Sequence, residues 1–192
     1  MIVLGLTGSI AMGKSTIANF AKYQHIPVLD LDKLAKTLIA NSTQVKDCFP
    51  ECLENGQLSS SKLAQVVFSN TSKLNLLEKI TYPALTDLII NKIKQYRRNY
   101  IKLIIIDAPK LFEARLHNLC DYVICVNAPQ FLQIQRIYKR KKYDDLQIKQ
   151  ILANQISNVK KMQMSDFIIQ TGNGKSHSLQ TLIQILKQLN NA

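Results

Sequence analysis

One eight-residue stretch constrains this chain more than any other: Gly8-Ser9-Ile10-Ala11-Met12-Gly13-Lys14-Ser15 fits the pattern G-x-x-x-x-G-K-[ST] at every fixed position. Residues 2–7 before it form a short apolar run typical of a buried strand, and residues 15–22 after it have the apolar spacing of a helix. A strand, a glycine-bounded loop and a helix N-terminus direct backbone N–H groups and a helix dipole toward an anion. The stretch therefore predicts a nucleoside triphosphate site.

Individual positions of this loop have distinct expected roles. Gly8 and Gly13 allow a close backbone approach that a Cβ would obstruct. Lys14 can reach the β- and γ-phosphates, and the Ser15 hydroxyl is placed to ligate Mg²⁺. The residues expected to contact the nucleotide are Gly8, Ala11, Met12, Gly13, Lys14, Ser15 and Thr16.

Strand-like and helix-like segments alternate along the rest of the chain. Further strands are predicted at 26–30, 101–107, 122–127 and 166–169, with helices between them and a final helix at about 178–189. Two helices divided at Tyr82-Pro83 are expected over 71–98, because proline suits a first helical turn and not a helix interior. The alternation predicts an α/β fold with a parallel five-stranded sheet flanked by helices, of the P-loop NTPase type. Ligands of such sheets bind beyond the carboxyl ends of the strands.

Two aspartates follow predicted strands at that edge. Asp32, shortly after residues 26–30, is a candidate for orienting and deprotonating an acceptor hydroxyl. Either Asp30 or Asp32 could instead cap the helix that follows. Asp107 ends the strand at 101–107 and is a candidate Mg²⁺ ligand, direct or through water, with a strand-end turn as the alternative.

A basic cluster follows the strand at 122–127. Five of its residues fall in a seven-residue window: Arg136, Lys139, Arg140, Lys141 and Lys142. Arg136 and Arg140 share a helix face and suit a mobile cover over phosphates. A solvated basic face is the alternative for the lysines, and Tyr138 and Tyr143 leave nucleic-acid binding open as a third interpretation.

Length and composition limit the class of protein. The 192 residues support one globular domain with room for an inserted lobe. The net charge of +12 indicates anionic partners without choosing among polyphosphates, nucleic acid and membrane surfaces. No apolar run reaches membrane-spanning length and no signal peptide is evident, so a cytoplasmic protein is expected. The four cysteines lack metal-site spacing and are expected to be ordinary thiols.

An ordered set of short segments resembles the dephospho-CoA kinase family over nearly the whole chain. The set comprises Gly5-Leu6-Thr7-Gly8, Val28-Leu29-Asp30-Leu31-Asp32, Tyr82-Pro83, Pro109-Lys110-Leu111-Phe112-Glu113, Gln135-Arg136, Arg140, Gln155, Lys161 and Ser165-Asp166. The resemblance implies transfer of the γ-phosphate of ATP to the 3′-hydroxyl of dephospho-CoA. It gives Asp32 the acid/base role, Lys14 and Arg140 further parts in catalysis, and Arg140 a place in a lid over the nucleotide.

The resemblance also implies an organisation of the chain. It divides the single domain into a core of residues 1–31, 99–128 and 165–192, a helical acceptor-side lobe of residues 33–95, and a lid region of residues 129–164. The residues that it assigns to the acceptor are Asp32, Tyr82, Pro83, Lys110, Leu111, Phe112, Glu113 and Arg136. The expected partners are the small molecules ATP and dephospho-CoA, without nucleic acid or membrane, for a monomer or weak oligomer.

Some residues depart from the family pattern, and other functions remain open. Tyr82 replaces histidine, Lys110 leucine and Asn158 arginine, and Gln170-Thr171-Gly172 replaces Asp-Asn-x-Gly. A shikimate-type or other small-metabolite or nucleoside kinase is the first alternative, although no glycine lies between Gly56 and Gly172 to form the acceptor loop of the shikimate type. A nucleic-acid-dependent NTPase is the second, and Asp107-Ala108 lacks the adjacent acidic residue that such enzymes use to activate water.

Overall fold

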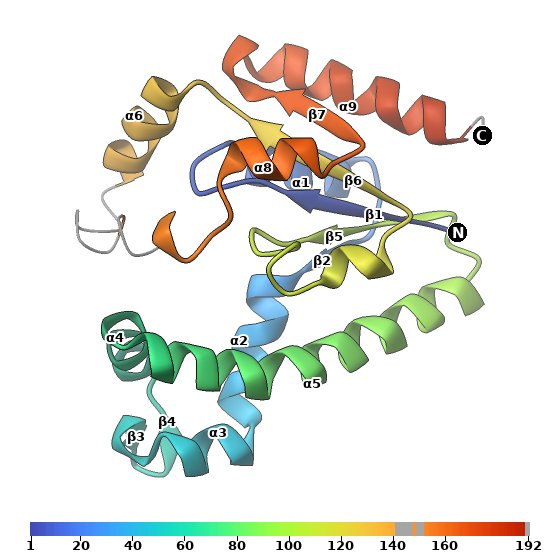
Figure 1. The fold of residues 1–192 in the computed structure, drawn as a ribbon. Coiled ribbons are helices and arrows are strands. Elements are labelled where there is room, and N and C mark those ends of the chain that lie inside the picture. Colours follow the sequence, from blue (N-terminus) through green and yellow to red (C-terminus); the bar gives the residue numbers. More distant parts are fainter. Residues whose placement is uncertain (141–147, 149–151, 191–192) are drawn as a thin grey trace. The chain divides into compact units, whose positions relative to one another are not determined.

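A parallel sheet forms the core of the protein, as the alternating pattern predicts. The computed structural model describes residues 1–140, 148 and 152–190. Five strands lie in the order β2-β5-β1-β6-β7, and Figure 1 shows helices on both faces of the sheet. Their bounds are β1 Ile2–Thr7, β2 Val28–Asp30, β5 Leu103–Asp107, β6 Tyr122–Asn127 and β7 Phe167–Gln170. The predicted α/β, P-loop-type fold is confirmed.

The register of the sheet follows from the central strand. β1 pairs in parallel with β5 on one side and with β6 on the other, and β6 pairs in parallel with β7. Because all these strands run in one direction, their carboxyl ends lie at one edge of the sheet. Thr7, Asp107 and Asn127 are the last residues of β1, β5 and β6 at that edge.

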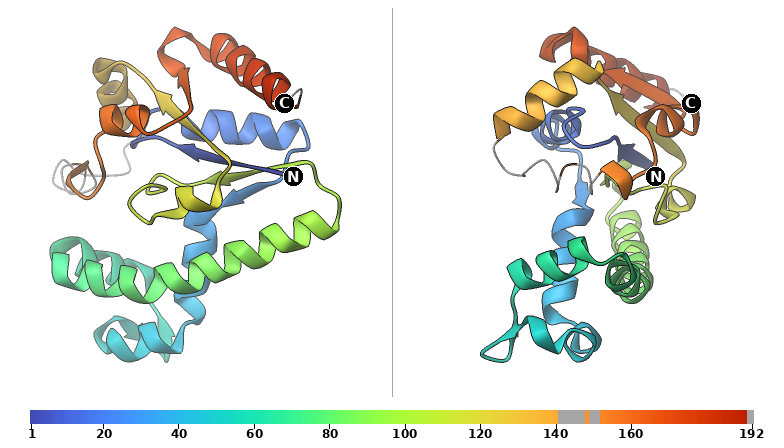
Figure 2. Two further views of the ribbon diagram at one scale, coloured as in Figure 1. Left: turned by 45° about the vertical axis from the view of Figure 1, so that its right-hand side comes forward. Right: turned by 60° about the vertical axis from the view of Figure 1, so that its left-hand side comes forward.

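The chain divides into two compact units, Met1–Leu29 with Tyr96–Ala192, and Asp30–Gln95. The first unit contains α1 Lys14–Tyr23, η2 Leu116–Leu119, α6 Gln130–Arg140, α8 Asn158–Gln163, η3 Thr171–Asn173 and α9 Lys175–Asn190. One face of its sheet packs against α1 and α9 (Figure 2). Ile17, Leu182 and Ile185 of these helices enter the same buried cluster as Leu4 and Leu6 of β1. On the opposite face, Leu111 and Cys120 lie against Gly5, where a Cβ would collide with them.

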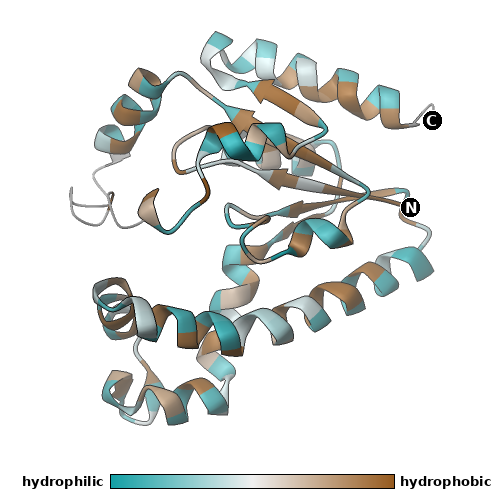
Figure 3. Cartoon of the chain, viewed as in Figure 1, coloured by the Kyte–Doolittle hydropathy of each residue, from teal (hydrophilic) through white to brown (hydrophobic). Residues whose placement is uncertain are grey.

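The second unit is helical and has its own small core. It contains α2 Leu31–Asn41, α3 Thr43–Cys48, η1 Pro50–Cys52, β3 Leu53–Glu54, β4 Gln57–Leu58, α4 Ser60–Ser69 and most of α5 Thr71–Arg98. Six buried residues form the centre of its apolar cluster: Val45, Phe49, Cys52, Leu63, Val67 and Leu77. In Figure 3, hydrophobic and hydrophilic residues alternate along these helices, as expected for helices with one buried side. Asn55 and Gly56 turn the β3–β4 hairpin with φ of 50° and 75°, the positive values that a tight hairpin needs.

The prediction of two helices divided at Tyr82-Pro83 is wrong. A single helix, α5, runs from Thr71 to Arg98 with Pro83 inside it. The buried positions Leu77, Thr81, Leu85, Ile89 and Ile93 recur every fourth residue, so the apolar stripe continues without a break past the proline. Pro83 itself is on the exposed side, where the burial of that stripe outweighs the loss of one backbone hydrogen bond.

Candidate active site

The loop between β1 and α1 has the backbone conformation that the glycine pattern predicts. Gly8 has φ of 150°, and a Cβ there would lie 2.9 Å from the Val126 carbonyl oxygen. Gly13 has φ of 98° and caps α1 directly before Lys14. Ala11 also lies in the left-handed region, with φ of 61°, at a cost on the order of 1 kcal/mol for a residue with a Cβ. The loop therefore holds a conformation that needs support from its surroundings.

That support comes from four side chains that are remote in sequence. Gln133 donates to the Ile10 carbonyl at 2.9 Å, and Thr171 Oγ1 donates to the Met12 carbonyl at 2.6 Å. Arg136 donates to the Ala11 carbonyl at 3.4 Å. The Ser9 amide donates to Asn158 Oδ1 at 3.0 Å. Each of the four consecutive residues from Ser9 to Met12 is thus hydrogen-bonded from outside the loop.

Thr171 hydrogen-bonds both to the phosphate loop and to Arg136. It accepts from one Arg136 Nη through its hydroxyl at 3.1 Å, and the other Arg136 Nη donates to its carbonyl at 2.9 Å. Its side chain also lies where a Cβ on Gly13 would collide, 2.9 Å from the hydroxyl oxygen. Arg136, predicted to bind the acceptor, is therefore hydrogen-bonded to the phosphate loop and to the residue that follows β7.

Lys14 and Asp107 meet across the sheet edge. The Lys14 ammonium lies 2.5 Å from Asp107 Oδ1, and both side chains are largely buried. Asp107 is the last residue of β5, whose partner in the sheet is β1. The edge that carries the phosphate loop therefore also carries an acidic group next to its lysine.

The segment after β5 is held from several sides. Leu111 and Phe112 are buried, whereas Lys110 and Glu113 are half-buried. Glu113 Oε1 lies 2.9 Å from the Lys161 ammonium and accepts the Ile156 amide at 2.8 Å. Leu111 and Phe112, predicted to contact the acceptor, pack in the interior, so their side chains anchor this segment.

The second unit carries the remaining predicted acceptor-side residues. Asp30 caps α2, accepting the Lys33 amide at 3.1 Å. Asp32, in the first turn of α2, is exposed and has no hydrogen bond or ion pair to any residue that the structure describes. The alternative that Asp32 caps the helix is therefore excluded, and its carboxylate is available. Tyr82 is half-buried in α5 and Pro83 is exposed beside it.

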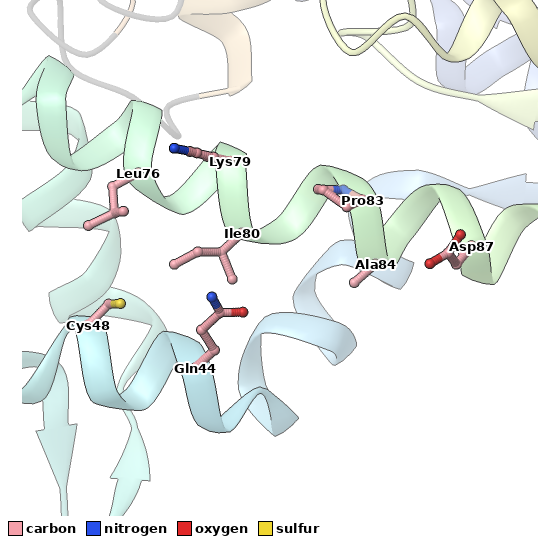
Figure 4. Close-up of a pocket in the computed structure, with 8 residues that line it drawn as sticks. All are labelled: Gln44, Cys48, Leu76, Lys79, Ile80, Pro83, Ala84 and Asp87. Carbon is pink, nitrogen blue, oxygen red and sulfur yellow. The ribbon is translucent and has the colours of Figure 1, made fainter.

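A cavity of about 530 Å³ lies within this second unit. Figure 4 shows Ile80 and Ala84 of α5 facing the same space as Gln44 and Cys48 of α3. The residues that line the cavity are Gln44, Cys48, Leu76, Lys79, Ile80, Pro83, Ala84 and Asp87. Apolar side chains and a few polar ones are the mixture that small-molecule sites use.

Arg140 is the last residue of α6, and its side chain lies outside the described part of the structure. The same holds for Lys141, Lys142 and Tyr143 of the basic cluster. Of the predicted lid region, α6 and α8 are described, and both contribute side chains that hold the phosphate loop.

Sequence reasoning missed three of the four loop supports. Gln133 received no role, and Asn158 and Thr171 were singled out only as departures from a family pattern. The topology offered a signal for Thr171, since it directly follows a strand of the sheet and so lies at the carboxyl edge. No such signal exists for Gln133, because its orientation depends on how α6 packs.

The described residues offer little support for a disulfide, a metal site or a membrane-spanning helix. All four cysteines are free thiols. Burial raises the pKa of Cys120 to about 12 and that of Cys125 to about 11. Within the described ranges, no cluster of three or more His, Cys, Asp or Glu side chains could hold a metal ion, and no helix is long and apolar enough to cross a membrane.

The comparisons with known proteins agree with one another. The family model for dephospho-CoA kinase matches residues 2–177. A dephospho-CoA kinase of Lactobacillus acidophilus is 39% identical over 175 residues, covering 87% of this chain and 86% of the relative. One from Bartonella quintana is 33% identical over 192 residues, covering 98% of each.

Among solved structures, this chain resembles both a dephospho-CoA kinase and a kinase that acts on another substrate. The dephospho-CoA kinase from Campylobacter jejuni superimposes with a TM-score of 0.73 at 26% identity, over 97% of this chain and 96% of that one. A shikimate kinase from Acinetobacter baumannii, at 16% identity and a TM-score of 0.56 over 98% and 94% of the two chains, shares the fold alone.

Proposed function

The chain belongs to the dephospho-CoA kinase family, and from this premise we propose that it transfers the γ-phosphate of ATP to the 3′-hydroxyl of dephospho-CoA, giving CoA and ADP. The observation that carries the proposal is the match of the family model to residues 2–177, together with an intact phosphate loop at its start. The proposed partners are these two small molecules, and the proposed location is the cytoplasm.

The nucleotide half of the reaction rests on the loop after β1. Its backbone amides and the N-terminus of α1 would surround the phosphates, and Lys14 would leave Asp107 to contact the β- and γ-phosphates. Arg136 and Thr171 hold the loop in position from outside. Arg140, at the end of α6, is proposed to cover the nucleotide and to stabilise charge on the transferring group.

The residues at the sheet edge fit a magnesium ion. Ser15, exposed in the first turn of α1, and Asp107, at the end of β5, offer hydroxyl and carboxylate oxygens, the hard donors that Mg²⁺ prefers. We propose that these two residues would hold the ion, Asp107 directly or through water. When bound, the ion would neutralise charge on the β- and γ-phosphates.

The acceptor half is proposed to depend on Asp32. Its exposed carboxylate would orient the 3′-hydroxyl and accept its proton late, because phosphoryl transfer passes through a loose transition state. Asp32 lies two residues beyond the end of β2, a strand of the sheet, and Asp30 takes the capping role. Among the described residues, the Asp32 carboxylate therefore neither caps the helix nor forms a hydrogen bond or an ion pair.

The other residues proposed to bind the acceptor lie in the segment after β5 and in the second unit. Lys110 supplies a positive charge for a polyanionic acceptor, with Glu113 beside it and with Leu111 and Phe112 as buried anchors. The cavity next to Pro83 is a suitable place for part of a long flexible acceptor. Tyr82 is proposed to contact the acceptor from the same helix.

A panel of acceptors tests this function. Purified protein with Mg-ATP is expected to form ADP with dephospho-CoA and not with shikimate, nucleosides or RNA, as measured by coupled ADP release. Ala84→Trp, which would fill part of the cavity, is expected to raise the KM for dephospho-CoA while the KM for ATP stays within about twofold, with exposed Ala153→Trp as the control. Turnover with another acceptor and none with dephospho-CoA would refute the proposal.

A further inference from the structure

Lys161, in α8, has a side chain with 0% exposure, although lysine is seldom fully buried. Its ammonium donates to the Pro109 carbonyl and forms an ion pair with Glu113 Oε1 at 2.9 Å. Burying a charge is unfavourable unless it is paired and hydrogen-bonded. Both partners of Lys161 lie in the segment directly after β5, so the buried charge is directed at that segment.

Glu113 joins this segment to α8 at a second point. Its Oε1 atom also accepts the backbone N–H of Ile156, at 2.8 Å. Ile156 lies just before α8 begins, and Lys161 lies within the helix. One carboxylate oxygen thus contacts both ends of residues 156–161, which sets both the position and the orientation of this stretch against the segment after β5.

The same stretch also contacts the phosphate loop. Asn158 accepts the Ser9 amide at 3.0 Å and donates to Asn127 Oδ1 at 2.8 Å at the end of β6. The Pro109 carbonyl, which accepts from Lys161, also accepts the hydroxyl of Thr7 at 3.3 Å. Thr7 directly precedes the loop. Residues 156–161 therefore connect the loop after β1 with the segment after β5.

We propose that Lys161 is a positioning residue for phosphoryl transfer, acting through Pro109 and Glu113 to fix the acceptor-side segment relative to the phosphate loop. The proposal rests on the proposed function. Lys161 is buried, and its role requires no contact with either substrate.

A purely stabilising role explains the arrangement less well. Replacing a buried ion pair with packed apolar side chains is often neutral or stabilising, so stability alone does not account for a charge at this position. Asp107, the partner of Lys14, lies only two residues before Pro109. Displacement of the segment by about 1 Å would misalign the groups on both sides of the transferred phosphate and can lower the rate by about a hundredfold.

The test compares Lys161→Met with Lys161→Arg and with Lys160→Met, a matched control on the exposed side of the same helix. For Lys161→Met we expect kcat with dephospho-CoA to fall about a hundredfold, while the Kd for ADP stays within about twofold. Lys161→Arg keeps a cation and is expected to recover kcat to within about fivefold of the parent. Lys160→Met is expected to behave as the parent.

The outcomes separate this proposal from the proposed function. A parent protein that does not phosphorylate dephospho-CoA refutes the proposed function, whatever the variants do. An active parent together with folded Lys161→Met of unchanged kcat overturns the positioning role, as does Lys161→Arg that is no more active than Lys161→Met. If Lys161→Met does not fold, Glu113→Gln decides, because its amide oxygen still accepts hydrogen bonds but carries no charge. We expect its kcat to fall about tenfold, and an unchanged kcat contradicts the proposal.

Discussion

The phosphate loop follows β1 and the start of α2 follows β2, two strands of the same sheet, yet the protein contacts their side chains and backbone very differently. Every residue from Ser9 to Met12 is hydrogen-bonded by a distant side chain, and Lys14 is paired with Asp107. Asp32, in contrast, is exposed and has no such contact among the described residues. The proposed nucleotide half is therefore preorganised by contacts within the protein, whereas the carboxylate proposed for the acceptor half has no protein partner among the described residues.

This difference has a physical reason. A loop that binds phosphate through backbone amides must hold them in a fixed array, including one residue, Ala11, in a costly conformation. A carboxylate that accepts a proton must keep an oxygen available to the substrate. Changes to the side chains that support the loop should therefore affect stability and nucleotide binding, and a change at Asp32 should affect turnover alone.

The largest effect is expected from Lys14→Ala. Loss of the ammonium removes a charge from the transferred phosphate and leaves Asp107 buried without its lysine, so kcat should fall by about a thousandfold. Coupled ADP release measures the loss, and exposed Lys22→Ala, at the other end of α1, is the control. A decrease of less than tenfold would remove Lys14 from the proposed chemistry.

Asp32→Asn is expected to lower kcat by a factor of about 10² to 10⁴, the range of general acid–base catalysis, without changing the Kd for ATP. Asp30→Asn is the matched control, because asparagine caps a helix as well as aspartate does. Steady-state rates and ATP titrations of both variants make the comparison. Equal losses in the two variants would contradict a special role of Asp32.

Thr171→Val sharpens the comparison from the nucleotide side. The substitution removes the hydroxyl that donates to Met12 and accepts from Arg136, so unfolding free energy should fall by about 1–3 kcal/mol and ADP affinity should weaken. Urea unfolding and ADP titration measure the two effects, and Thr37→Val on the exposed face of α2 is the control, because it also removes a hydroxyl that donates to a backbone carbonyl. Unchanged ADP affinity would show that the loop does not need this support.

The smallest effect concerns buried thiols. Burial raises the pKa of Cys125 from 9.0 to about 11, so this thiol stabilises the folded state below about pH 9, and the contribution is lost as pH rises through about 11. Cys125→Ala should therefore show a shallower decline of unfolding free energy between pH 9 and 11, by up to about 1 kcal/mol per pH unit. Exposed Cys48→Ala of the second unit should match the parent. An identical slope in Cys125→Ala would contradict this assignment.

Much of the fold could be predicted because the sequence carries it locally. The apolar runs at 2–7 and 122–127 coincide with β1 and β6, and the glycine pattern specifies the turn between β1 and α1. The break expected at Pro83 is absent because a buried stripe along α5 determines the helix and the proline lies off that stripe. A local rule was overridden there by packing.

In the candidate site, too, residues with a local sequence signal could be predicted, and residues placed by long-range packing could not. The residues of the phosphate loop could be recognised from their spacing, and Asp107 from its place at the end of a strand. The supports of the loop could not, because Gln133 and Asn158 are more than 120 residues away from the atoms that they contact. Such contacts depend on how α6 and α8 pack on the core, which no local pattern encodes.

Direct transfer of the phosphate tests the central claim. Protein incubated with Mg²⁺, dephospho-CoA and ATP labelled at the γ-phosphate should move the label to dephospho-CoA, with the product gaining one phosphate at the 3′-position. Lys14→Ala should show no transfer under the same conditions. Label released as inorganic phosphate at the same rate with and without dephospho-CoA would contradict the account.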